Sequence, residues 1–118
     1  MNSIRLDKTI AIEGVGINVP GSKSESNRAL IINALCEPSG EIKNLAIARD
    51  TDTMLRLLSQ TSANYDVLDA GTTMRFLTAY LSLGSQSVQI TGTERMQKRP
   101  IKILVEALRK LGVEIDYL

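Results

Sequence analysis

Three short stretches of the sequence combine a glycine with hydroxyl, ammonium and guanidinium side chains, a combination that suits the binding of an anion. The first runs from Pro20 to Arg28 and reads PGSKSESNR. Ser22 followed by Glu25 three residues later is typical of a helix start, and the outward backbone N–H groups of a helix start favour a negative charge. Arginine can hold a carboxylate or phosphate through two parallel hydrogen bonds, whereas lysine offers a mobile point charge. The alternative interpretation is a capped helix with solvated Lys23 and Arg28.

The other two stretches repeat this combination later in the chain. Asp69 to Arg75 reads DAGTTMR and places Gly71 at a predicted helix start, where glycine lets a ligand approach the backbone closely. Gly92 to Pro100 reads GTERMQKRP and carries three basic residues on a predicted irregular loop. A plain turn with a threonine cap and a solvated charged loop are the alternatives, and Arg75 suits a structural ion pair equally well. Because all three stretches bring cations to helix starts, together they favour an anion-binding site.

These stretches lie between strands and helices that alternate along the chain. Runs of β-branched residues predict short strands, and apolar residues every three or four positions predict helices. The predicted strands are Ile4–Leu6, Thr9–Ile12, Gly16–Val19, Glu41–Leu45, Tyr65–Leu68, Ser87–Ile90 and Val113–Tyr117. The predicted helices run from Ser22 to about Cys36, over 52–60 with a cap at Asp50 or Thr51, over 71–83, and from Pro100 to Gly112. This alternation predicts an α/β (α+β) fold with helices packed on sheet.

The composition disfavours several classes of protein. The chain has 14 basic and 13 acidic residues, so it lacks the basic excess of a nucleic-acid binder. It has no histidine, which excludes histidine metal sites and Ser-His or Cys-His nucleophile pairs within these 118 residues. Its single cysteine, Cys36, follows an apolar run and is predicted to be a buried, inert thiol in a reducing cytoplasm. No apolar stretch approaches the roughly 20 residues that span a bilayer, so a cytoplasmic protein without membrane contact is expected.

Taken together, the three stretches resemble the signature segments of EPSP synthases (3-phosphoshikimate 1-carboxyvinyltransferases). The matching patterns are P-G-S-K-S-x-S-N-R-A-L, A-G-T-x-M-R, and R-M-x-x-R-P-I followed by L-V-x-A-L-x-x-L-G, in this order and over nearly the whole chain. The resemblance implies part of an inside-out α/β barrel built from βαβαββ units. It also implies that residues 1–19 cross to a second domain, that 20–118 form part of the N-terminal substrate-binding domain, and that the C-terminal domain is absent.

The resemblance further implies roles for five residues. Lys23, Ser24 and Arg28 would contact shikimate 3-phosphate, and Lys23, Gly71 and Arg99 would contact phosphoenolpyruvate in the pocket that also takes glyphosate. The implied reaction transfers the enolpyruvyl group to the 5-hydroxyl of shikimate 3-phosphate and releases phosphate, with no metal and no organic cofactor. The general acid and base are expected in the missing C-terminal part, so the chain is predicted to hold no catalytic residue and to be inactive alone.

Two departures and three alternatives accompany this resemblance. Asp69 stands where many relatives carry asparagine, and the stretch from Thr61 to Val67 is shorter than in many relatives. The related UDP-N-acetylglucosamine enolpyruvyl transferases carry a reactive cysteine where this chain has Glu94, which disfavours that activity. A non-catalytic anion-binding half-domain, active only with its missing part, is compatible with the resemblance. An RNA-binding domain is disfavoured, because aromatic side chains on which bases could stack make up only 3% of the chain.

Overall fold

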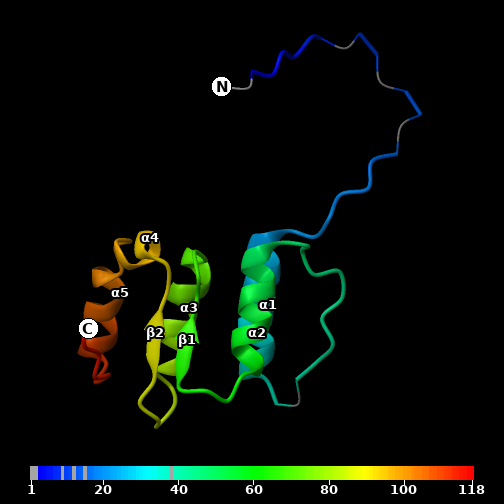
Figure 1. Cartoon of the computed structure of the whole chain (residues 1–118). Helices are drawn as coiled ribbons and strands as arrows, with labels where there is room; N and C mark the ends of the chain where they lie inside the picture. The colour runs from blue at the N-terminus through cyan, green and yellow to red at the C-terminus, as the bar shows by residue number, and fades with distance from the viewer. Residues whose placement is uncertain (1–2, 9, 12, 15, 38) are drawn as a thin grey trace.

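The computed structural model describes residues 3–8, 10–11, 13–14, 16–37 and 39–118. Two helices come first, then a strand, a helix and a second strand, and finally two more helices (Figure 1). The described residues before position 21 belong to no helix or strand. The helices are α1 (Lys23–Leu35), α2 (Arg49–Ser59), α3 (Gly71–Leu81), α4 (Glu94–Gln97) and α5 (Lys102–Lys110). The strands are β1 (Asn64–Asp66) and β2 (Gln89–Thr91). The mixed helix-and-strand class predicted from the sequence is therefore confirmed.

The centre of the fold is the unit β1–α3–β2, in which the two strands pair in parallel. Asn64 lies opposite Gln89, and Asp66 lies opposite Thr91. Parallel strands need a crossover connection, and α3 supplies it. Two further backbone hydrogen bonds extend the pairing, from Val67 N to Thr91 O at 2.9 Å and from Gln89 N to Ala63 O at 2.8 Å. This arrangement brings the end of β1 and the start of α3 to one edge of the molecule.

Side chains from four helices, from β1 and from the residue just after β1 form the core, and Ile90 of β2 packs against it. It consists of Leu30, Met54, Leu57, Tyr65, Val67, Met74, Leu77 and Met96. On α2, Met54 and Leu57 are buried, whereas Leu55 is 40% exposed. On α5, Val105 and Leu108 are buried, as the apolar spacing of that segment predicts. With few aromatic residues, the core depends on leucine, methionine and valine.

Helix starts follow the sequence more closely than strands do. The Ser22 hydroxyl accepts a hydrogen bond from Glu25 N at 3.3 Å and caps α1, as predicted. Helix α2 begins at Arg49, earlier than predicted, and its cap position is Ala48 rather than Asp50 or Thr51. The stretch predicted to be an irregular loop before Pro100 contains α4, capped by the Thr93 hydroxyl and anchored by the buried Met96. Helix α5 then starts at Lys102.

Four predicted strands are not formed, because a strand needs a neighbour to accept its backbone hydrogen bonds. They are Ile4–Leu6, Gly16–Val19, Glu41–Leu45 and Val113–Tyr117; the segment Thr9–Ile12 includes residues outside the described part of the chain. Ile42 and Leu45 instead pack against the core from an irregular segment. The C-terminal segment folds back on α5, where Arg109 Nε donates to Ile115 O at 2.9 Å and the guanidinium lies over the Tyr117 ring.

Cys36 was predicted to be buried, and that prediction is wrong: its side chain is exposed. The apolar run before it covers more than one face of α1, and only Leu30 of that run is buried. Ile32 and Leu35 are 61% and 54% exposed. Cys36 itself has left the helical conformation, since its φ and ψ of −90° and 142° are extended. The thiol therefore lies beyond the packed face of the helix.

Candidate anion-binding site

Helices α1, α2 and α3 all begin at the same edge, the upper one in Figure 1. Side-chain hydrogen bonds connect the three starts. Lys23 Nζ, in the first turn of α1, donates to Asp50 Oδ2 in the first turn of α2 at 3.2 Å. The backbone carbonyl of Asp50 accepts a hydrogen bond from Thr73 Oγ1 in α3 at 3.4 Å. Lys23 is thus linked through Asp50 to the start of α3, so this cation lies near the helix starts.

The three helix starts differ in how their positive ends are compensated. Helix α1 has the Ser22 cap and Glu25 in its first turn, and α2 has Asp50 and Asp52 in its first turn. Helix α3 has neither a side-chain cap nor an acidic residue in its first turn. The first N–H groups of a helix have no partner inside the helix and carry the positive end of the helix dipole. The start of α3 is therefore the one that most lacks a negative partner.

Arg99 lies directly against this start. A Cβ atom added at Gly71, the first residue of α3, would overlap Nη1 of Arg99. Such a Cβ would also lie 3.2 Å from Nη1 of Arg75. Glycine at position 71 therefore leaves the space that the Arg99 guanidinium occupies. A guanidinium beside free N–H groups is an arrangement suited to a phosphate or carboxylate.

Arg75 holds the segment that carries Arg99. Its Nη1 donates to Gly71 O at 3.1 Å, and its Nη2 donates to Pro100 O at 2.8 Å. The side chain therefore ties the residue after Arg99 to the first turn of α3. Sequence reasoning suggested that Arg75 was either a ligand contact or a structural ion-pair partner. The structure gives it a structural role through two backbone carbonyls.

Asp69 lies two residues before Gly71 and forms an ion pair across the edge. Its Oδ2 is 3.7 Å from Nη1 of Arg49, the first residue of α2. Both side chains are substantially exposed, at 69% for Arg49 and 47% for Asp69. Neither Arg49 nor Asp50 was singled out from the sequence as a site residue. The only signal was a cluster of charges at a helix start, which is also what ordinary capping produces.

The remaining predicted residues, Ser24 and Arg28, lie in the first turns of α1. Arg28 Nη1 donates to Ser24 O at 3.1 Å, and both residues are exposed. Within the described part of the chain, no hydrogen bond or ion pair joins Arg28 to Gly71 or Arg99. The structure therefore links Lys23 to α2 and α3 and brings Gly71 and Arg99 together, while Arg28 lies on α1 without a contact to either group.

The approach to α1 is fixed by close backbone packing. A Cβ atom on Gly21 would overlap the carbonyl oxygen of Asn44. The buried Ser26 hydroxyl accepts a hydrogen bond from Ala46 N at 2.9 Å, one turn into the helix. These contacts hold the irregular segment before α2 against the start of α1. They position Lys23 opposite Asp50.

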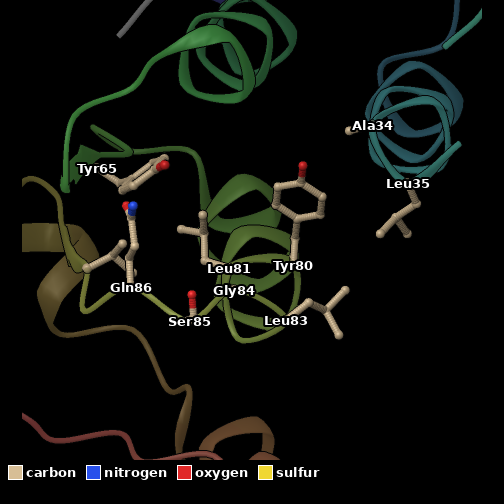
Figure 2. A pocket seen from close by; sticks show the side chains of 10 residues that line it. Ala34, Leu35, Tyr65, Tyr80, Leu81, Leu83, Gly84, Ser85 and Gln86 are labelled. Carbon is tan, nitrogen blue, oxygen red and sulfur yellow. The ribbon is translucent and has the colours of Figure 1, made fainter. Parts of the chain in front are cut away.

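A cavity of about 480 Å³ lies away from these cations. It is bordered by the end of α1, by β1 and by the end of α3, and its lining includes Leu35, Tyr65, Tyr80 and Leu83. Figure 2 shows the Tyr80 ring beside Leu81, with Leu35 on the opposite helix. No lysine or arginine lines this cavity. Its chemistry does not suit an anion, so the edge at the helix starts is the better candidate site.

The described residues contain no group of three or more histidine, cysteine, aspartate or glutamate side chains placed to hold a metal ion. None of their helices is both long enough and apolar enough to cross a membrane.

Comparison with known proteins gives the same family across the whole chain. The sequence pattern of EPSP synthase (3-phosphoshikimate 1-carboxyvinyltransferase) matches residues 7–69 and 58–118. A 3-phosphoshikimate 1-carboxyvinyltransferase of Bacteroides fragilis (strain YCH46) is 54% identical over 101 residues, covering 86% of this chain and 25% of the relative. The enzymes of the same name from Proteus mirabilis and Sulfurovum sp. are each 41% identical over 144 positions, covering all of this chain and 33% and 34% of the relatives.

The chain therefore spans a quarter to a third of the length of these relatives. The Proteus mirabilis alignment has 144 positions against 118 residues here, so it includes positions that this chain lacks. The two family matches overlap at residues 58–69, between the end of α2 and the start of α3. The overlap of the two family matches includes the stretch from Thr61 to Val67, which the sequence analysis expected to be shorter than in many relatives.

Proposed function

The chain belongs to the EPSP synthase family, and from this membership we propose that it is the N-terminal part of a 3-phosphoshikimate 1-carboxyvinyltransferase. The complete enzyme transfers the enolpyruvyl group of phosphoenolpyruvate to the 5-hydroxyl of shikimate 3-phosphate and releases phosphate, a reaction of the shikimate pathway in the cytoplasm. The observation that carries the proposal is the position of Arg99 against Gly71, at the uncompensated start of α3.

The charges of the site suit the two substrates. Each substrate carries a phosphate and a carboxylate, so a site that holds both must offset several negative charges. Fixed cations and helix N-termini do this with little reorganisation as the reaction proceeds. In the proposed arrangement, Lys23, Ser24 and Arg28 hold shikimate 3-phosphate. Phosphoenolpyruvate is held by Arg99, by the backbone at Gly71 and by Lys23, which serves both substrates.

Lys23 is well placed for this double role because its present partner is exchangeable. The Lys23–Asp50 ion pair is partly open to solvent, with 53% and 26% of the two side chains exposed. Such a pair contributes about 0–1 kcal/mol to stability, so a phosphate can compete for the ammonium at little cost. Asp50 then keeps Lys23 near the starts of α2 and α3 in the absence of substrate.

In the proposed reaction, the 5-hydroxyl of shikimate 3-phosphate adds to the enol carbon of phosphoenolpyruvate, and phosphate then leaves.

The proposal extends to the architecture of the complete protein. Residues 20–118 contribute helix-on-sheet elements to the N-terminal half of an inside-out barrel of βαβαββ units. Residues 1–19 cross to the second domain and pair there. The exposure of Ile4, Leu6, Ile10, Ile17 and Val19 supports this, because β-branched and aliphatic side chains at 75–99% exposure suit a segment whose partner strands lie elsewhere.

A titration of the ¹⁵N-labelled chain with shikimate 3-phosphate tests the proposed substrate. We expect amide shifts centred on Lys23, Ser24 and Arg28, and none with UDP-N-acetylglucosamine. Lys23→Met should weaken the affinity about tenfold, because hydrogen bonds to charged groups contribute about 1.5–3 kcal/mol. Lys110→Met, the same substitution at the far end of α5, serves as the control and should leave the affinity unchanged. Equal responses to both ligands, or equal effects of the two substitutions, would contradict the assignment.

The 118-residue chain alone should give no detectable turnover. The general acid and base of the family are expected in the part of the relatives that this chain does not match. Phosphate release from a mixture of phosphoenolpyruvate and shikimate 3-phosphate measures this, with the full-length Bacteroides fragilis relative as the positive control. Adding the C-terminal three quarters of that relative should restore release. Turnover by the chain alone would show that its own residues suffice for the chemistry.

A further inference from the structure

The ion pair between Arg49 and Asp69 joins the starts of α2 and α3, which the Thr73–Asp50 hydrogen bond also connects. Arg49 is the first residue of α2, and Asp69 immediately precedes the cap position of α3, which is Ala70. Their charged atoms are 3.7 Å apart, and both side chains are largely accessible to solvent. Exposed pairs of this kind contribute little to stability. An effect on the electrostatic field at the start of α3 is the more consequential property of this pair.

Each charge would act strongly if it stood alone. Asp69 lies two residues before Gly71, where the N–H groups of α3 and the Arg99 guanidinium form the positive site. An unpaired carboxylate there would repel a phosphate or carboxylate and would itself compete for the helix start and for Arg99. The Arg49 guanidinium, 3.7 Å from this carboxylate, partly offsets its negative charge. The site then presents the charge of Arg99 and the helix start to an incoming anion.

We propose that Arg49 and Asp69 form a charge-compensating pair that sets the affinity of the α3 site for phosphoenolpyruvate. This inference rests on the proposed function. Arg49 is a positioning residue that acts through Asp69, and it does not contact the substrate. Arg49 offsets the charge of the carboxylate at position 69, which lies beside the start of α3.

The pair predicts an asymmetric pattern among four variants. Arg49→Ala exposes the charge of Asp69 and should weaken binding of phosphoenolpyruvate about tenfold at low ionic strength. Asp69→Asn removes the repulsive charge and should bind as tightly as the unchanged chain, or more tightly. The double variant should return to within about threefold of the unchanged chain, because non-additivity is the signature of a coupled pair. Arg49→Lys should retain most of the affinity, since the positive charge is kept.

Binding of phosphoenolpyruvate to the 118-residue chain is measured by amide chemical shifts, first at low salt and then at about 1 M salt. At about 1 M salt the Debye length falls to about 3 Å, so the difference in affinity between Arg49→Ala and the unchanged chain should shrink. Asp52→Asn is the control. It removes an aspartate charge from the first turn of α2, and the affinity should change less than about twofold. Dispersed spectra for every variant establish that the fold is intact.

The outcomes separate the pair from the function on which it rests. An affinity that falls in Arg49→Ala and recovers in the double variant supports the pair. Equal weakening in Arg49→Ala and the double variant would overturn it, because Arg49 would then hold the anion or the fold directly. Four equal affinities would overturn it as well. An unchanged chain that shows no saturable binding of phosphoenolpyruvate would contradict the proposed function, and the pair with it.

Discussion

Gly71→Ala should weaken the binding of phosphoenolpyruvate by about 10- to 100-fold and leave the stability of the chain nearly unchanged. The added Cβ overlaps the Arg99 guanidinium. That group is the end of a flexible side chain, so it can move away without disturbing the backbone. Its departure removes charge-assisted hydrogen bonds that contribute about 1.5–3 kcal/mol to binding. The measurement is a titration with phosphoenolpyruvate, together with urea unfolding to test the fold.

Gly40→Ala is the matched control for this substitution. Its Cβ would lie 3.6 Å from Asn33 Oδ1, an ordinary van der Waals contact, and no cation of the site is near it. The affinity should therefore stay as it is in the unchanged chain. If Gly71→Ala binds phosphoenolpyruvate normally, Arg99 does not hold the anion at the start of α3. If it fails to fold, position 71 has a role in packing that the arrangement of Arg99 does not explain.

Leu57→Ala should lower the free energy of unfolding by about 2–5 kcal/mol, the range found when a buried leucine is truncated. Leu57 is only 1% exposed and belongs to the core cluster that joins α2 to the sheet and α3. Its removal leaves a cavity as well as losing apolar contact. Urea unfolding followed by circular dichroism gives the change through the shift in midpoint, provided that the slope of the transition is unchanged.

Leu55→Ala provides the comparison on the same helix. Leu55 is 40% exposed, so the same truncation should cost less than about 1 kcal/mol. The two leucines stand two positions apart on α2, so the two measurements compare its covered side with its exposed side. Similar losses at the two positions would mean that Leu55 is covered in solution, for example by a second chain. A small loss at Leu57 would place the core elsewhere.

The sequence predicted the starts of α1 and α3 correctly because the signals for them are local, whereas it placed the start of α2 too late and did not predict α4. Ser22 with Glu25 marks the start of α1, and Gly71 marks the start of α3 at the residue where the structure begins it. Strands were predicted less well, since β-branched residues indicate a preference that only a neighbouring strand can satisfy. Tyr65 pairs with Ile90 of the neighbouring strand. The segments Glu41–Leu45 and Val113–Tyr117 pair with no strand, and no pattern within their sequences indicates that a partner strand is missing.

In the candidate site, too, residues with a local sequence signal were predicted, whereas a contact between residues far apart in the chain was not. Lys23, Gly71 and Arg99 were predicted as site residues from the family resemblance, and each stands beside a helix start or glycine that marks the sequence. Arg49 and Asp69 were not recognised as partners, because they are far apart in the chain and an ion pair leaves no local pattern. The prediction that Cys36 is buried was wrong for a related reason. An apolar run that surrounds a helix does not say which face the rest of the protein covers.

The parallel pairing of β1 and β2 also determines how this part of the chain folds. Neither strand has a hydrogen-bonding partner close in sequence, since Asn64 pairs with Gln89 across the whole of α3. Loop closure must therefore precede the gain from pairing, a requirement that slows folding relative to a hairpin. We therefore expect the two strands and α3 to form and separate together. An anion bound at the start of α3 would stabilise the folded unit by mass action and would thereby oppose separation of the two strands.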